Sequence, residues 1–171
     1  MADAPKTAKH TLTLQAPIYE ALKRSAAKRG LDVNTHMQNV LTDHVIDDDT
    51  LDAETRAQIE LGRSLIDRAV ETAKQRCRDG LFARTITLDT FQACTADPKW
   101  AADYKTYVGA DIFKHGNPLK RINREIGFRI RAAIGGEVEK DDTGAAVNAK
   151  VLGEVIQSYT PMKAFDPKIV G

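Results

Sequence analysis

The chain has no apolar run long enough to span a bilayer, and its first residues lack the hydrophobic core of a signal peptide. Cysteine is scarce. Cys77 and Cys94 form no CxxC pair, so we expect two reduced, buried thiols rather than a disulfide or a metal site. These absences predict a cytoplasmic protein that makes no contact with a membrane.

Catalytic signatures are also lacking. The four histidines show no HExxH spacing, and the sequence contains no glycine-rich phosphate loop, nucleophile elbow or zinc signature. We therefore expect a protein that is not an enzyme and that holds no metal and no cofactor.

The net charge of +1 hides an uneven distribution along the chain. Residues 1–46 carry +2, residues 47–60 carry −5, residues 61–136 carry +6 and residues 137–171 carry −2. The overall charge therefore says little about nucleic-acid binding. The acidic stretch that begins at Asp47 is the predicted domain boundary.

Residues 9–15 alternate between polar and apolar side chains, which predicts a short strand. Leu12 and Leu14 share one face, and the other face carries Lys9, Thr11 and Thr13. The first face requires a core, and the second is available to a polar partner.

Two amphipathic helices follow this strand, hinged at Gly30-Leu31. Pro17 marks the first turn of the first helix, which has an apolar face with a four-residue spacing made by Ile18, Leu22 and Ala26. Asp32 is a suitable N-cap for the second helix, whose apolar stripe continues to about residue 46.

This order of strand, helix, turn and helix resembles the ribbon-helix-helix (Arc/MetJ/CopG-like) family of DNA-binding domains. The residues that carry the resemblance are Thr11-Leu12-Thr13-Leu14, Leu22 in the first helix, and Gly30-Leu31-Asp32-Val33-Asn34 at the turn. It covers only the first quarter of the chain. It implies an intertwined homodimer whose paired strands enter the major groove of double-stranded DNA.

The resemblance also implies roles for individual residues. The contacts to DNA bases fall on Lys9, Thr11 and Thr13. The contacts to a DNA phosphate fall on backbone N–H groups in the first turn of the second helix, at Val33, Asn34 and Thr35. The chain departs from the family at Asp32, where serine is common, because a carboxylate near a phosphate weakens that contact.

A helical hairpin preceded by alternating Thr and Leu also occurs in domains that touch no nucleic acid. A unit this small cannot bury enough surface alone, and an isolated strand needs a partner. The N-terminal unit therefore either dimerises or packs on the rest of the chain.

The remainder of the chain is predicted to be mostly helical. Apolar residues at every fourth position predict a long helix over 53–79, and Asp97-Pro98 begins another that closes at Gly109. We expect Trp100 to be a core residue rather than a platform for stacked bases. Between these helices, residues 85–88 read as an extended link and Asp89 as the cap of a short helix.

Residues 118–134 predict a helix with an apolar stripe and, on another side, a basic ridge formed by Lys120, Arg124 and Arg131. Two interpretations of the ridge stay open: a solvated surface and a second phosphate-binding face. Residues 137–151 then predict a β-hairpin with its turn at Asp142-Thr143-Gly144, and residues 151–156 a last short helix.

The predicted fold is therefore mainly α, with an N-terminal ribbon-helix-helix unit and a helical C-terminal domain that includes a β-hairpin. In chain order we expect a disordered arm (1–8), the DNA-binding unit (9–46), an acidic linker (47–52), the C-terminal domain (53–160) and a loosely held tail (161–171).

The function that best fits these patterns is a sequence-specific DNA-binding protein, a transcriptional repressor that acts as a homodimer or a higher oligomer on DNA. The C-terminal domain would then oligomerise or bind a protein partner. Two alternatives share the same DNA-binding unit: an accessory protein of plasmid mobilisation, partition or phage packaging, and an antitoxin.

Overall fold

The computed structural model describes residues 11–29, 31–109 and 117–170, and it is mainly helical. In chain order the elements are α1 (Ala16–Lys28), α2 (Val33–Asp47), α3 (Ala53–Arg78), α4 (Ile86–Ala96), α5 (Pro98–Val108), α6 (Asn117–Ala133), β1 (Glu137–Val138), β2 (Ala149–Lys150), β3 (Ser158–Tyr159), β4 (Met162–Ala164) and α7 (Pro167–Val170).

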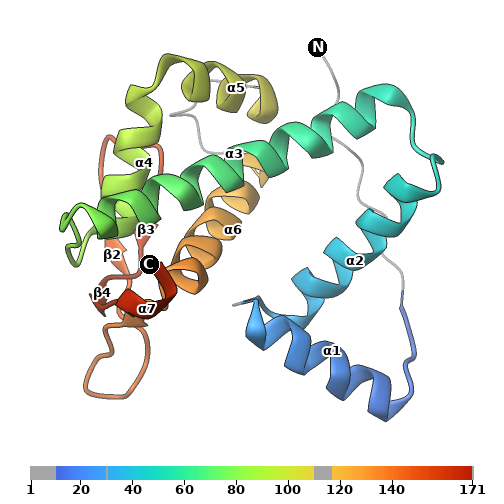
Figure 1. Ribbon diagram of the computed structural model, residues 1–171, viewed down its shortest axis with the longest axis horizontal. Helices are drawn as coiled ribbons and strands as arrows, with labels where there is room; N and C mark the ends of the chain where they lie inside the picture. Colours follow the sequence, from blue (N-terminus) through green and yellow to red (C-terminus); the bar gives the residue numbers. More distant parts are fainter. Residues whose placement is uncertain (1–10, 30, 110–116, 171) are drawn as a thin grey trace.

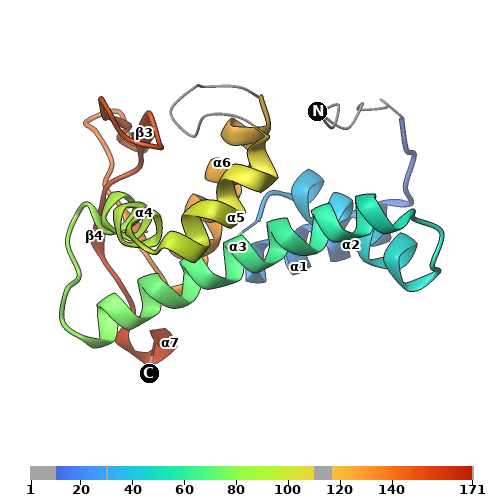
Figure 2. The same ribbon diagram turned by 90° about the horizontal axis from the view of Figure 1, so that it is seen from above.

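Helices α1 and α2 form a hairpin toward the N-terminal end of α3, whereas the strands lie toward its C-terminal end (Figures 1 and 2). Helices α4, α5, α6 and α7 all contact α3, so this long helix is the centre of what we call the helical body (the described residues from 53 to 170). The predicted acidic linker falls on the connection between α2 and α3.

The predicted long helix is confirmed as α3, and its small apolar residues face the core. Because they recur every four residues they lie on one side of the helix. Four of them are buried: Leu65, Ala69, Ala73 and Cys77. Both cysteines are free and buried, and burial raises the pKa of each thiol, so they serve as packing residues.

Helix α5 begins and ends as predicted. The Asp97 side chain caps its N-terminus, and Gly109, with a left-handed φ of 66°, ends it. Trp100 is buried and stacks on Tyr104 with ring centroids 4.7 Å apart. Its Nε1–H donates to the Leu65 carbonyl at 3.2 Å, so Trp100 is a core residue, as expected.

The predicted helix over 118–134 is confirmed as α6, within one residue at each end. Its apolar stripe packs into the core of the helical body, where the buried residues of this helix are Leu119, Ile122, Ile126 and Ile130. The charged residues of the same helix are left on its other sides.

Residues 137–151 turn back as predicted, but their two arms pair with later segments. Gly144, at a φ of 83°, donates its N–H to the Asp141 carbonyl at 2.9 Å, and Lys140 forms an antiparallel bridge with Ala146. Beyond this turn, β1 pairs with β4 and β2 pairs with β3, both antiparallel. Two small sheets therefore replace the single predicted hairpin.

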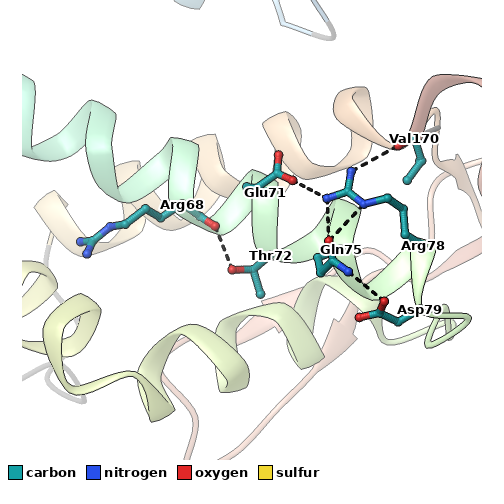
Figure 3. A network of polar contacts seen from close by, with 7 residues as sticks. All are labelled: Arg68, Glu71, Thr72, Gln75, Arg78, Asp79 and Val170. Carbon is teal, nitrogen blue, oxygen red and sulfur yellow. Dashed lines mark hydrogen bonds and ion pairs between the residues drawn. The ribbon is translucent and has the colours of Figure 1, made fainter.

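Residues 161–170 pack on α3 and the other elements of the helical body, which corrects the prediction of a loose tail for this described part. Met162 and Val170 are buried. The Val170 carbonyl accepts a hydrogen bond of 3.3 Å from Arg78, whose guanidinium is also held by Glu71 and Gln75 (Figure 3). Pro167 begins the short helix α7, where the missing N–H of proline costs no intrahelical hydrogen bond.

Three further local predictions were wrong. Asp89 is not the cap of a short helix, because it lies inside the first turn of α4, whose N-cap is Thr85. Residues 85–88 are not an extended link, because α4 begins at Ile86 and buries both Ile86 and Thr87. Their β-branched side chains favour strands, but packing against the core decides the conformation. Residues 151–156 form no helix: bends run from 152 to 157, and Gly153, with a φ of 75°, interrupts helical geometry there.

Candidate nucleic-acid interface

The start of α2 is built by Asp32, which confirms the predicted N-cap. Its backbone is extended, and its Oδ1 accepts hydrogen bonds from the N–H groups of Asn34 at 3.1 Å and Thr35 at 3.0 Å. Its Oδ2 accepts a third hydrogen bond, of 2.6 Å, from the Thr35 hydroxyl. This side chain satisfies donors that a helix N-terminus otherwise leaves unpaired.

The same hydrogen bonds occupy part of the predicted phosphate site, which comprises the N–H groups of Val33, Asn34 and Thr35. Two of these three groups already donate to Asp32. Hydrogen bonds from Thr35 are the largest cause that lowers the pKa of Asp32, and the charge of Arg124 lowers it further. A phosphate at this helix end would meet an ionised carboxylate, so the site is poorer than the resemblance implies.

The predicted base-contacting residues precede α1. Thr11 and Thr13 are exposed, whereas Lys9 lies outside the described residues. Residues 11–15 form no strand within the single described chain. A strand needs a partner, and the predicted partner is the same segment of a second copy. The paired ribbon therefore stays a prediction about the dimer.

The hairpin of α1 and α2 leaves much of its apolar surface uncovered. Among its described apolar residues only Ala26 and Leu31 are buried. Leu12, Ile18 and Leu41 are 57%, 51% and 56% exposed, and Tyr19 and Val40 are exposed as well. Several large apolar side chains exposed on one small unit favour an interaction surface.

Lys120, Arg124 and Arg131, the predicted basic ridge, line one groove with a volume of about 580 Å³. Its opposite side comes from a segment that we call the β2–β3 wall (residues 146–160). No aspartate or glutamate among the described residues lines this groove. Within that part of the chain none of the three cations forms an ion pair.

Arg124 also lines a second, smaller hollow of about 230 Å³ between α2 and α6. Thr35 from α2 and Arg121 and Glu125 from α6 share this hollow. One residue of the predicted phosphate site and one residue of the basic ridge therefore meet here. The predicted base contacts, phosphate site and basic ridge share no other hollow. Lys120 and Arg131 line only the larger groove.

Sequence reasoning missed residues in both hollows. Arg121 and Phe128 lie three residues before and four residues after Arg124, which puts them on one side of α6, and this spacing could have revealed them. The polar side chains of the β2–β3 wall, such as Asn148 and Gln157, had no such signal. They reach the groove only through the pairing of β2 with β3.

The described residues hold no group of three or more His, Cys, Asp or Glu side chains arranged for a metal ion. Within the same ranges, no helix has the length and apolar character needed to cross a membrane. Comparison of the chain with protein-family models, with curated proteins and with solved structures gave no match.

Proposed function

We propose that the protein binds double-stranded DNA sequence-specifically as a homodimer and represses transcription by occupying a promoter. The segment before α1 pairs with its copy in the dimer, and Lys9, Thr11 and Thr13 contact base edges in the major groove. The observation that carries the proposal is a capped helical hairpin with uncovered apolar side chains and two exposed threonines before it.

The dimer explains why the hairpin is incomplete alone. An exposed apolar side chain gains free energy when a partner removes it from water. In ribbon-helix-helix proteins, which this unit resembles, the two copies interlock, and such side chains become the shared core. The proposal therefore assigns Leu12, Ile18 and Leu41 to the dimer interface rather than to the surface of a monomer.

Contacts to DNA phosphates are shared in this proposal between the first turn of α2 and α6. Asp32 already accepts from Asn34 and Thr35, so those N–H groups offer less to a phosphate. Arg121 is exposed and lines the hollow beside Thr35, where its guanidinium suits a bidentate phosphate contact.

Selection of bound sequences from a random pool of duplex DNA, with the full chain, tests the proposal. We expect an enriched sequence with two-fold symmetry, because two identical half-sites face a symmetric dimer. Binding should weaken steeply with salt, since phosphate neutralisation releases counterions.

The Thr11→Ala/Thr13→Ala variant is the decisive comparison, and Thr106→Ala, an exposed threonine on α5, is the matched control. We expect the double variant to stay dimeric and to lose the sequence preference, while the control keeps it. The same enriched sequence from the double variant and the wild type would contradict base reading by the ribbon.

A further inference from the structure

We propose that the groove between α6 and the β2–β3 wall is a binding site for a small phosphorylated molecule with a flat ring, which is the chemistry of a free nucleotide. This site is distinct from the proposed DNA contacts of the segment before α1, and the inference does not depend on them.

The charge of the groove points to an anion. Three cations line it, and no described carboxylate does. A concave site lined by charges of one sign focuses the potential on a ligand of the opposite sign. Lys120 and Arg124 are exposed, and Arg131 is half-buried over the Phe128 ring, 5.4 Å from its centre.

Beneath these cations the groove offers apolar surface and fixed polar groups. Its floor includes the buried side chains of Phe91, Ile156 and Met162. Asn123 is fixed because its Oδ1 accepts from the Tyr104 hydroxyl and its Nδ2 donates to a backbone carbonyl at 3.1 Å. An amide nitrogen carries two hydrogens, and only one of them has an acceptor among the described residues.

Rings that could stack on a flat ligand lie in the same groove. Phe128 from α6 and Tyr159 from β3 both line it, and both are half-buried, so each keeps part of its surface open. Aromatic pairs prefer stacked or edge-to-face packing. A phosphate held by the cations therefore leaves an attached ring beside aromatic partners.

Gly127 keeps this groove open, and packing does not require it. Glycine inside a helix costs about 1 kcal/mol relative to alanine. A Cβ on Gly127 would meet Thr87 Cγ2 at 3.9 Å, which is ordinary contact, whereas a Cβ on Gly62 would come within 2.6 Å of Tyr107. Gly62 is therefore explained by helix packing, but Gly127 is explained by the space that it leaves in the groove.

The volume of about 580 Å³ falls within the range of small-molecule sites. Duplex DNA fits the groove poorly, because it presents phosphates on a convex surface and keeps its bases stacked inside. It would leave the apolar floor uncovered. A free nucleotide offers both the phosphate and the ring to one concave site.

Calorimetric titration of the full chain tests this inference, with the mono-, di- and triphosphates of adenosine, guanosine, cytidine and uridine as probes. Inorganic phosphate, the four unphosphorylated nucleosides and a single-stranded oligonucleotide serve as comparison ligands. We expect at least one nucleotide to bind at least about tenfold more tightly than its nucleoside, since each charge-assisted hydrogen bond is worth that much or more.

Two variants distinguish binding inside the groove from non-specific attraction to positive charge. Lys120→Gln/Arg131→Gln should weaken nucleotide binding at least about tenfold by the same reasoning. Gly127→Met fills the groove without changing charge and favours the helix, so it should abolish binding while the thermal midpoint stays at or above the wild-type value. Lys105→Gln, an exposed cation on α5, is the matched control and should bind like the wild type.

Failure of every nucleotide to bind would overturn the inference, and so would wild-type binding by Gly127→Met. Equal affinity for inorganic phosphate and for nucleotides would remove the role of the ring. If the single-stranded oligonucleotide bound and no free nucleotide did, the inference of a small ligand would be wrong, and the groove would bind a nucleic-acid strand. No duplex DNA enters these titrations, so none of these outcomes bears on the proposed function.

Discussion

The hairpin of α1 and α2 and the helical body differ in how far they bury their apolar side chains. Every residue of the main hydrophobic cluster lies between Leu65 and Val170, and the helical body covers this core with its own elements. The hairpin buries only Ala26, Leu31 and His36 among its described residues and leaves larger apolar side chains in water. The body therefore buries most of its large apolar side chains within one chain, although Leu81, Leu152 and Ile169 stay exposed, whereas the hairpin leaves most of its own exposed or half-buried.

The largest effect should come from the core of the body. Ile126 is fully buried, so Ile126→Ala should lower the free energy of unfolding by about 2 to 5 kcal/mol. Urea unfolding followed by circular dichroism measures this loss. If the proposed dimer interface of the hairpin does not depend on the core of the body, the variant should still dimerise in the absence of urea. A monomeric variant would contradict this independence.

A smaller effect is expected when the uncovered face of the hairpin is changed. Leu41→Ser removes about 1 kcal/mol of apolar burial per copy, and hence about 2 kcal/mol per dimer, which weakens dimerisation more than tenfold. Sedimentation equilibrium measures the dissociation constant. Leu152→Ser, at a 95% exposed position of the body, is the control and should leave dimerisation unchanged.

The cap of α2 should contribute about 1 kcal/mol, which Asp32→Ala would remove and Asp32→Ser would largely retain. Because hydrogen bonds from Thr35 lower the pKa of Asp32 in the folded chain, its contribution is present above the usual aspartate pKa and is lost as the pH falls through the lowered value. Unfolding of wild type and Asp32→Ser as a function of pH checks this sign.

Asp32→Ser should also tighten DNA binding several-fold, because it removes a carboxylate from the proposed phosphate contact while a hydroxyl still caps the helix. Fluorescence anisotropy with the selected duplex measures the change. Unchanged or weaker binding by Asp32→Ser would mean that the first turn of α2 does not face DNA.

The smallest effect tests whether the body touches DNA at all. Arg121→Gln should weaken binding evenly across sequences and reduce the salt slope by about one for each phosphate that the variant no longer neutralises. Lys99→Gln, an exposed cation on α5, should leave both quantities unchanged. Equal salt slopes for Arg121→Gln and wild type would confine DNA binding to the hairpin and the segment before it.

Sequence patterns predicted what local chemistry determines. Asp32 and Asp97 cap helices because a side-chain oxygen reaches N–H groups two or three residues away, and the four-residue stripe of α3 needs only helical periodicity. Long-range pairing was not predictable in this way. Strands as short as β2 and β3 carry almost no pattern of their own.

The groove also combines residues that the sequence predicts with surroundings that it does not predict. The cations Lys120, Arg124 and Arg131 were predicted to share one side of a helix, and they do line one groove. The absence of carboxylates among the described residues around them could not be predicted, because it depends on which distant residues form the facing wall. The position of Arg124 beside Thr35 likewise depends on how α2 and α6 pack.

The contacts of the last segment have a consequence for the order of events during synthesis. Residues Met162 and Val170 fill the core of the helical body, and β1 can pair only after β4 has been made. The body therefore cannot close until nearly all of it has left the ribosome. Domains generally fold from the N-terminus as they emerge, so the α1–α2 hairpin is available first. Where several ribosomes translate one message, we expect neighbouring nascent chains to join through their hairpins before either body has folded.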